Sequence, residues 1–317
     1  MPLMPQKHSS VKVLYIGGMG RSGSTLLGRL LGSLPGYVNV GEVYLLWERW
    51  FSHSIRCGCG EVFAECGFWQ DVFQSAFEGV DAARIAQTGE IQQRLLRRDN
   101  LPALLFGRGR AGQNDYRRAV ARLYQAIAAA TGARVLVDTS KYASYAYLLN
   151  GIPEIDLRFA HLVRDSRAVA FSPGRRKLNP SFVDKETYMT PHSWQDSARQ
   201  WNFQNGIVHV RRPSPHTLRL RYEDLVRAPR AALAPVFDFL DEPAPSLDFL
   251  NSPSLTPDHT VSGNPIRFQP QIVIRPDLEW RKRMPTRLKI LVTLATFPLL
   301  AHYGYLRPDG TYPRRRL

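Results

Sequence analysis

The sequence predicts a three-layer α/β fold, in which a central and mostly parallel sheet is flanked by helices. Short runs rich in β-branched and aromatic residues alternate along the chain with segments of helical spacing. The first such run ends in glycines and leads directly into a helical segment. Because no internal repeat or heptad pattern competes with this alternation, we expect a single domain over residues 1–317.

Five strands are expected, and the segments between them are mostly helical. Residues 43–131 form a cysteine-containing helical insertion, with helices over 83–98 and 116–130, and residues 173–191 lack periodicity and are expected to form a loop. Parallel sheets bind ligands beyond the carboxyl ends of their strands, so functional residues are expected there. The expected strands are 11–16, 37–41, 133–138, 157–163 and 217–222.

The composition is that of a globular, basic protein. Among 317 residues, 42 Lys and Arg face 27 Asp and Glu, a net charge of +15, and 44% of the residues are hydrophobic. Such a charge favours anionic partners, namely phosphorylated cofactors, acidic substrates, nucleic acid or an anionic membrane surface. No charge-free apolar run reaches the length of about 18 residues that a membrane span needs.

The two ends of the chain and its cysteines indicate where in the cell the protein is expected. The first apolar run is too short and too β-branched for a secretory signal, and three cysteines are a poor disulfide framework, so a reducing cytoplasm is expected. Residues 288–317 are expected to form an apolar helix, interrupted by Pro298, and a basic tail. Packing in the core is favoured for this helix, and peripheral contact with a membrane stays open.

The glycine-rich loop at residues 17–25 has the composition of a phosphate-binding site. Its backbone N–H groups and the following helix end can hold an oxyanion, while Arg21 and the hydroxyls of Ser24 and Thr25 add donors. Nucleotide triphosphatases need a lysine where this loop has Ser24, which argues against ATP or GTP hydrolysis. A dinucleotide-binding pattern also matches at residues 18–23, with Glu42 as the one available ribose-binding acid.

Several segments resemble the sulfotransferases that use 3′-phosphoadenosine-5′-phosphosulfate (PAPS). Residues 20–27 (GRSGSTLL) are similar to the family's 5′-phosphosulfate loop in its arginine form, and residues 163–172 (VRDSRAVAFS) to its 3′-phosphate element. Further similar segments are Val137-Asp138-Thr139-Ser140-Lys141, Arg221-Tyr222-Glu223-Asp224-Leu225, His259-Thr260-Val261-Ser262-Gly263-Asn264-Pro265 and Tyr303-Gly304-Tyr305.

The resemblance implies a P-loop-like fold and an enzyme that transfers a sulfonyl group from PAPS to an acceptor hydroxyl, without a metal. Arg164 and Ser172 are then expected to hold the 3′-phosphate, and Arg267 is a further candidate for it. The product 3′,5′-diphosphoadenosine (PAP) would occupy the same donor site. The implied donor-binding residues are Gly20, Arg21, Ser22, Gly23, Ser24, Thr25, Arg164, Ser172, Tyr222, Ser262, Gly263 and Asn264.

A general base must take the proton of the acceptor hydroxyl. Glu42, just after the second expected strand, resembles the family's glycine-glutamate base, with His53 and His192 as alternatives. Lys141, expected at the start of the next helix, and Arg21 would stabilise charge on the departing phosphate.

The cysteines Cys57, Cys59 and Cys66 are expected to be a packing segment rather than a metal site. Their spacing is not that of a zinc finger, and His53 lies on the wrong side to complete a ligand set. The resemblance implies no metal there.

Three functions therefore stay open, of which the sulfotransferase is favoured. The alternatives are an ATP-dependent small-molecule kinase using the same loop and a nucleic-acid-binding protein. The basic clusters (175–177, 211–212 and 281–283) are scattered, and no recognition motif accompanies them, so nucleic acid is not expected as a partner. The acceptor would be a carbohydrate, a phenol or a lipid-linked molecule, with aromatic residues suited to its pocket at Tyr44, Trp47, Trp50, Phe51, Trp194 and Trp201.

Overall fold

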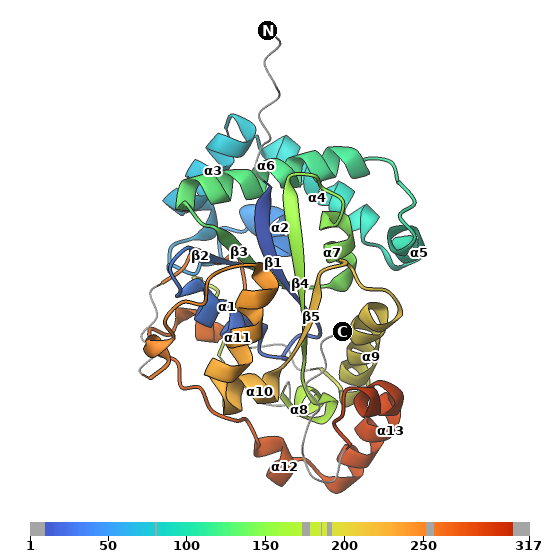
Figure 1. Ribbon diagram of the computed structural model, residues 1–317. Coiled ribbons are helices and arrows are strands. Elements are labelled where there is room, and N and C mark those ends of the chain that lie inside the picture. The colour runs from blue at the N-terminus through green and yellow to red at the C-terminus, as the bar shows by residue number, and fades with distance from the viewer. Residues whose placement is uncertain are drawn as a thin grey trace.

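The computed structural model describes residues 10–79, 81–172, 178–184, 186–188, 192–251 and 257–306. Five strands form one sheet in the order β2-β3-β1-β4-β5, and all four neighbouring pairs are parallel (Figure 1). This confirms the predicted parallel sheet flanked by helices. The strands are β1 Val11–Gly17, β2 Tyr37–Gly41, β3 Val135–Lys141, β4 Ile155–Val163 and β5 Thr217–Arg221.

Helices occupy most of the remaining described chain. The insertion between β2 and β3 contains α2 Leu46–Trp50, α3 Gly67–Phe77, α4 Ala82–Leu95, α5 Leu101–Leu105 and α6 Gln113–Thr131. The other helices are α1 Ser24–Gly32, α7 Ala143–Leu149, α8 Ser166–Phe171, α9 Trp194–Val210, α10 Tyr222–Arg227, α11 Pro229–Leu240, α12 Glu279–Arg283 and α13 Thr286–His302.

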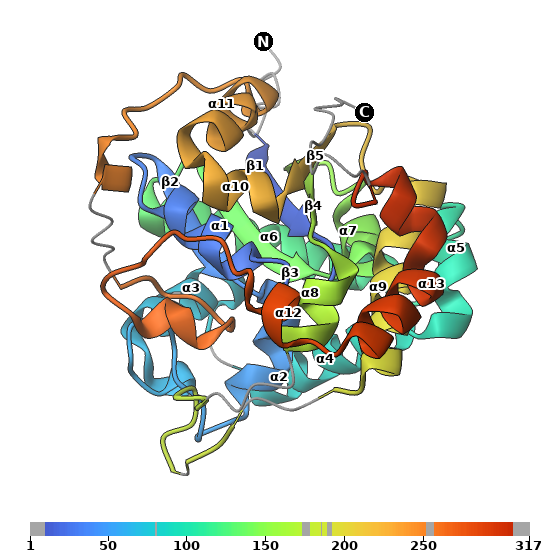
Figure 2. The same ribbon diagram turned by 90° about the horizontal axis from the view of Figure 1, so that it is seen from below.

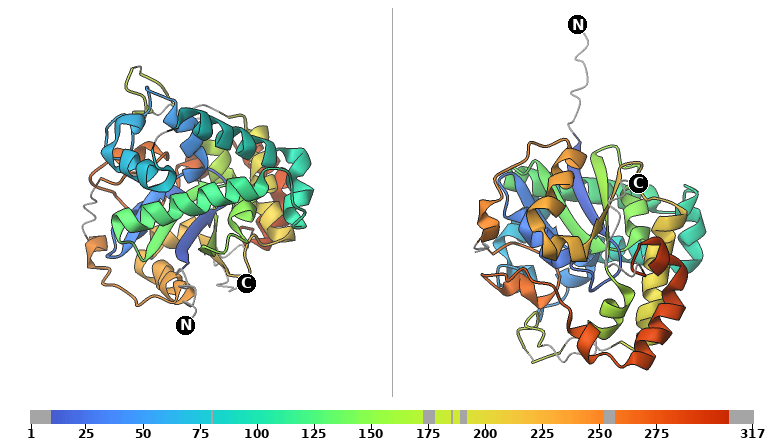
Figure 3. Two further views of the ribbon diagram at one scale, coloured as in Figure 1. Left: turned by 90° about the horizontal axis from the view of Figure 1, so that it is seen from above. Right: turned by 60° about the horizontal axis from the view of Figure 1, so that its bottom comes forward.

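The sheet is covered on both faces because successive side chains of a strand point to opposite sides. Val13 and Tyr15 of β1 belong to a core shared with helices of the insertion, including α3 and α6. Leu14 and Ile16 belong to a second core, on the opposite face, which α1, α10 and α11 cover. The left panel of Figure 3 shows α6 crossing one face while α11 lies on the other.

Two sequence predictions at the end of β3 need correction. The strand continues to Lys141, and the next helix begins at Ala143, so Lys141 ends a strand instead of starting a helix. Lys141 has a φ of 73°, a left-handed conformation that is uncommon for a residue with a side chain. The chain turns sharply there, which periodicity could not indicate.

The last long helix, α13, is less buried than the sequence predicted. Its buried residues are Val292, Thr296 and Leu300, while the exposed fractions of Ile290, Leu294 and Phe297 are 54, 66 and 53%. No helix in the described part of the chain has the length and apolarity to cross a bilayer. The predicted basic tail and residues 173–177, which include one of the basic clusters, lie outside the described residues.

The register of the central strands brings three loops to one end of the sheet. Gly17 at the end of β1 is paired with Lys141 of β3 and His161 of β4. Figure 2, which views the molecule from this end, shows α1, α8 and α12 surrounding it. Residues that follow β1 therefore meet residues that follow β3 and β4, although more than a hundred positions separate β1 from these two strands.

A buried carboxyl group, Asp138, fixes the exit of β3. Its Oδ1 accepts hydrogen bonds from the backbone N–H (2.7 Å) and the hydroxyl (2.5 Å) of Ser140, and the hydroxyl of Tyr124 on α6 donates to Oδ2. Ser140 Oγ in turn accepts from the backbone N–H of Tyr44, two residues after Glu42. Asp138 therefore links the exits of β3 and β2. Full burial raises its pKa to about 6. The hydrogen bonds from Ser140 and Tyr124 favour the charged form and oppose this shift.

Asp138 should make the stability of this protein depend on pH. Because its pKa is raised in the folded state from 3.8 to about 6, the folded chain binds more protons than the unfolded chain over that range, and stability falls as pH rises through it. Asp138→Asn removes this contribution. The stability of the variant relative to wild type should therefore improve by about 2 kcal/mol between pH 4 and pH 7.

Urea unfolding of both proteins at the two pH values measures this change. Asp115→Asn, at an exposed carboxylate on α6, is the matched control, and its stability relative to wild type should be nearly the same at both pH values. A difference between wild type and Asp138→Asn that is the same at both pH values would contradict the assignment.

Candidate active site

A cavity of about 800 Å³ opens at the carboxyl end of the sheet. The loops after β1, β2, β3 and β4 and a segment near the carboxyl end of the chain line it. Every sequence-predicted donor or catalytic residue except Ser22 is among its lining residues: Gly20, Arg21, Gly23, Ser24, Thr25, Glu42, Lys141, Arg164, Ser172, Tyr222, Ser262, Gly263 and Asn264. One cavity thus brings together residues that the sequence places in six separate segments.

The glycine loop has the backbone geometry of an anion cradle. Gly23, immediately before α1, has a φ of 92°, and a Cβ there would lie 2.5 Å from the ring of Tyr222. A Cβ on Gly18 would lie 2.3 Å from the backbone carbonyl oxygen of Leu162. Glycine is therefore required at both positions, which lets the loop wrap the amino end of α1. At Gly20, by contrast, an added Cβ would meet no atom within 4 Å, so the loop faces open space there.

Ser22 is buried inside the loop, with 2% of its surface exposed. Its hydroxyl makes no hydrogen bond within the described residues, and such buried polar groups usually have a partner. Neighbouring Arg21 adopts a left-handed φ of 67°, which is strained for a residue with a side chain. Both features fit a loop whose polar groups are completed by an anion.

Arg164 supplies a second cationic group in the same cavity. Its guanidinium donates to the backbone oxygen of Arg21 (2.8 Å), forms an ion pair with Asp277 (3.0 Å) and stacks 4.1 Å from the ring centroid of Tyr222. Its Nε has no partner within the described residues although it is buried. The ion pair with Asp277 shows that Arg164 can bind a negatively charged oxygen at this end of the cavity.

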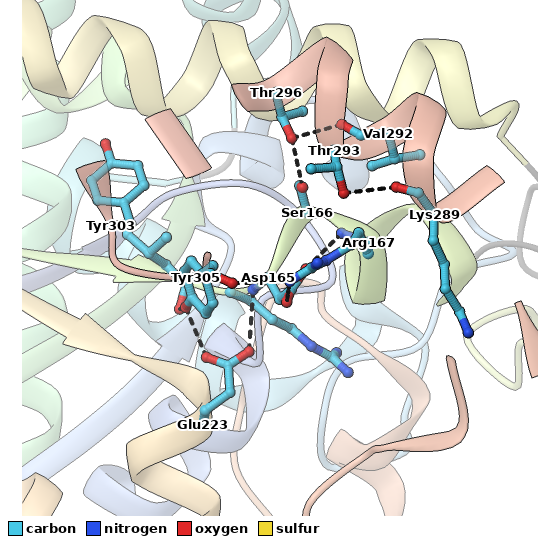
Figure 4. Close-up of polar contacts among 12 residues, drawn as sticks. Asp165, Ser166, Arg167, Glu223, Lys289, Val292, Thr293, Thr296, Tyr303 and Tyr305 are labelled. Atoms are coloured by element: carbon cyan, nitrogen blue, oxygen red, sulfur yellow. Dashed lines mark hydrogen bonds and ion pairs between the residues drawn. The ribbon is translucent and has the colours of Figure 1, made fainter. Parts of the chain in front are cut away.

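The position of Arg164 depends on a network around the start of α8 (Figure 4). Half-buried Glu223 accepts from the backbone N–H of Asp165 (3.1 Å) and from the hydroxyl of Tyr305 (2.7 Å). Burial and the neighbouring Asp165 carboxylate raise the pKa of Glu223. Ser166 and Thr296 of α13 are joined through their hydroxyls at 2.7 Å. The carboxyl-terminal segment thus anchors the loop that presents Arg164.

Glu42 and Lys141 form an ion pair at the exits of β2 and β3. Both side chains are largely buried, with 13 and 17% of their surfaces exposed, and both line the cavity. Arg21 lies near enough to be affected electrostatically by Glu42, while its own pKa is lowered mainly by burial. Among the described residues that line the cavity, Glu42 and Asp277 are the carboxylates, so Glu42 is a candidate to accept a proton there.

The segment at residues 262–264 covers the start of α1. The hydroxyl of Thr25 accepts a hydrogen bond from the backbone N–H of Asn264 (3.1 Å). Arg267, which the sequence suggested for the 3′-phosphate, lines the cavity and donates to the backbone oxygens of Thr260 (2.8 Å) and Arg56 (2.7 Å). It is 1% exposed, and burial lowers its pKa to about 10. Arg267 therefore ties the carboxyl-terminal segment to the helical insertion.

None of the six aromatic residues that the sequence suggested for the acceptor pocket lines the cavity. Trp47, Trp50 and Trp201 are buried in hydrophobic clusters, because large rings fill space between packed elements. Tyr142, Phe182 and Tyr188 line the cavity instead. Of the two alternative histidines, His192 lines it and His53 does not.

The cysteine segment lies apart from the cavity and gathers a partner from far along the chain. The ligand atoms of Cys57, Cys59, Cys66 and His259 all lie within 4.8 Å of one another. Spacing within the cysteine segment could not indicate His259, because it is 193 residues from Cys66. His53, which the sequence analysis considered, is not part of this cluster.

Comparison with known proteins agrees with this geometry. The sulfotransferase family model matches residues 14–246, and a search of curated proteins found no significant match. The fold is similar to the sulfotransferase domain of the Synechococcus PCC 7002 olefin synthase (TM-score 0.53, 21% identity, covering 96% of this chain and 98% of that one). It is also similar to the sulfotransferase domain of the curacin biosynthetic pathway (TM-score 0.52, 20% identity, 92% and 97%). The chain therefore belongs to the sulfotransferase family, whose chemistry is the transfer of a sulfonyl group.

Proposed function

We propose that this protein transfers the sulfonyl group of PAPS to the hydroxyl of a small carbohydrate, phenolic or lipid-linked acceptor. The observation that carries the proposal is the presence of two cationic groups in one cavity. One is the glycine loop with Arg21, and the other is Arg164, which stacks on the ring of Tyr222. PAPS carries its negative charge in two separate places, the 5′-phosphosulfate and the 3′-phosphate, and two cradles match that distribution. Residues 1–317 would act as a single domain, in the cytoplasm.

The 5′-phosphosulfate is assigned to the loop at residues 20–25 and the 3′-phosphate to Arg164 and Ser172. The phosphate would replace the Asp277 carboxylate as the anionic partner of Arg164. Tyr222 and residues 262–264 would then contact the nucleoside between the two cradles. No metal is needed to hold such a ligand, since six of the described lining residues are Lys or Arg (Arg21, Arg49, Lys141, Arg164, Arg267, Arg275).

The reacting groups are Glu42, Lys141 and Arg21. As the acceptor oxygen forms a bond to sulfur, the bond between sulfur and the bridging oxygen of the donor breaks, and the hydroxyl proton passes to Glu42. Lys141 and Arg21 stabilise the charge that develops on the departing phosphate. The negatively charged donor would attract Lys141. Binding of the donor would therefore loosen the ion pair between Lys141 and Glu42 and free the Glu42 carboxylate to act as a base.

An ATP-dependent kinase is the alternative that shares the phosphate loop. It is disfavoured because the position of the loop lysine is occupied by Ser24, at the start of α1. Magnesium dependence separates the two reactions.

Calorimetric binding of PAP, 5′-AMP and Mg-ATP tests the donor assignment. We expect PAP to bind with a micromolar or lower Kd and 5′-AMP at least tenfold more weakly, since a hydrogen bond to a charged group contributes about 1.5–3 kcal/mol. Arg164→Ala should remove most of this preference by weakening PAP while leaving 5′-AMP little changed. Arg118→Ala, at an exposed arginine on α6, is the control.

A preference for Mg-ATP over PAP would move the protein to the kinase class. An unchanged ratio of PAP to 5′-AMP affinity in Arg164→Ala would instead leave the donor possible and reject Arg164 as the 3′-phosphate ligand.

Glu42→Gln tests the general base, because glutamine keeps the shape of the side chain and removes its basicity. Transfer of sulfonyl from PAPS to a panel of phenols, sugars and alcohols should fall by about 10² to 10⁴, while the Kd for PAP changes by less than about threefold. Glu48→Gln, an exposed glutamate on α2, should retain activity. Full turnover in Glu42→Gln combined with a loss in His192→Ala would assign the base to the histidine.

We further propose that α13 contacts anionic membrane surfaces, bringing the enzyme to lipid-linked acceptors. Ile290, Leu294 and Phe297 form an exposed apolar stripe at helical spacing, beside the basic residues of α12 and the start of α13.

Sedimentation with vesicles tests this contact. Wild type should associate with phosphatidylglycerol vesicles and less with phosphatidylcholine vesicles, and replacing the three residues with serine should reduce association at least fivefold. Val273→Ser, at an exposed valine outside α13, should have little effect. Equal partition of wild type and the triple variant would contradict the proposal.

A further inference from the structure

The three cysteines and His259 form a compact set of soft and borderline ligands. Cys59 Sγ lies 3.7 Å from Cys66 Sγ, and the Nδ1 atom of His259 lies 3.3 Å from Cys66 Sγ and 3.8 Å from Cys57 Sγ. All four ligand atoms fall within 4.8 Å of one another. The cysteines come from the helical insertion, whereas His259 comes from the carboxyl-terminal segment that covers the glycine loop.

These separations are close to those of a tetrahedral zinc site. With Zn–S bonds of about 2.3 Å and Zn–N bonds of about 2.0–2.1 Å, a regular tetrahedron places two sulfurs about 3.8 Å apart and a sulfur and a nitrogen about 3.6 Å apart. The three distances given above differ from these values by a few tenths of an ångström. Zinc binds three cysteines and one histidine in many structural sites.

The surrounding fold holds the cysteines in place independently of one another. In the turn at residues 57–61, the backbone N–H of Cys57 donates to Glu61 (2.8 Å) and that of Gly60 to Cys57 (3.0 Å). Cys66 directly precedes α3, and its carbonyl oxygen accepts from Gln70 (3.0 Å). The two parts of the cysteine segment are thus preformed around the same point.

His259 is oriented by two aromatic residues of the insertion. Its ring stacks on Phe68, with centroids 4.5 Å apart, and its backbone oxygen accepts from the indole of Trp69 (3.0 Å). These contacts direct Nδ1 toward the sulfurs. An imidazole nitrogen facing thiols has no apolar packing role, whereas it is an ordinary ligand once a metal lies between them.

We propose that Cys57, Cys59, Cys66 and His259 bind one Zn²⁺ as a closed structural site. Four protein ligands complete a tetrahedron and leave no position for substrate, so the metal takes no part in sulfonyl transfer. A Cys59–Cys66 disulfide would use two of the four groups and leave Cys57 and His259 unexplained. The proposal stands without the assignment of the donor or the acceptor.

The metal would join the helical insertion to the cover of the active site. The backbone N–H of Gly58 donates to Thr260 (3.0 Å), and a Cβ at Gly58 would lie 2.3 Å from the hydroxyl of Thr260. From Thr260 the chain continues into residues 262–264, which meet Thr25. Zinc therefore fixes the distance between the cysteine turn and the segment that closes over the glycine loop.

Metal analysis of the full chain, purified without chelator under reducing conditions, tests the site. We expect about one zinc per chain in wild type and a loss of at least tenfold in His259→Ala and in Cys66→Ser. His53→Ala, which changes the histidine nearest in sequence, is the matched control and should keep its zinc. His259→Cys should restore binding, since thiolate is also a zinc ligand, which separates ligation from a packing role for the imidazole.

A second measurement does not depend on how well the variants fold. Wild type from which zinc has been removed by chelation should show faster amide hydrogen exchange at residues 57–61 and 259–264, and added Zn²⁺ should reverse the change. Wild type that holds no zinc and takes none up from solution with its thiols reduced would overturn the proposal. A Cys59–Cys66 disulfide in the intact mass of freshly purified protein would overturn it as well.

Discussion

The active-site cavity depends on the position of β1 between β3 and β4. Parallel strands release their chains at the same edge of the sheet, so the central strand decides which loops become neighbours. Gly17 is paired with Lys141 on one side and His161 on the other, which places the glycine loop between the segment of Lys141 and that of Arg164. If the register of either neighbour shifted by one residue, its side chains would change faces and this set would separate.

The charges that line the cavity indicate the class of ligand more narrowly than the net charge of the protein does. Among its described lining residues are six lysines and arginines but only two carboxylates, Glu42 and Asp277, each paired with a cation. Burial strengthens these interactions and leaves the excess positive charge for a ligand. The charge of +15 alone was equally compatible with nucleic acid, whereas a concave site lined by several cations favours a small anionic molecule.

The carboxyl-terminal part of the chain completes the site although the family match ends at residue 246. Tyr305 and Thr296 anchor the start of α8, Asn264 docks on Thr25, and Arg267 ties this segment to the insertion. The proposed zinc site would add a metal-coordinated link between the carboxyl-terminal segment and the helical insertion. These residues act by holding the loops that bear the cations, so their role is positional.

The sequence by itself determined the sheet, its glycine loop and the set of candidate donor and catalytic residues, all of which except Ser22 line the cavity. Strands and glycine loops leave local signals, because side-chain alternation and left-handed turns restrict residue type over a few positions. The tertiary structure decided what depends on long-range packing: the strand ending at Lys141, the burial of the tryptophans expected near the acceptor, the role of Asp138, and the meeting of His259 with three cysteines. No spacing rule joins residues almost two hundred positions apart, because only the folded sheet and the segments packed on it set the distance between them.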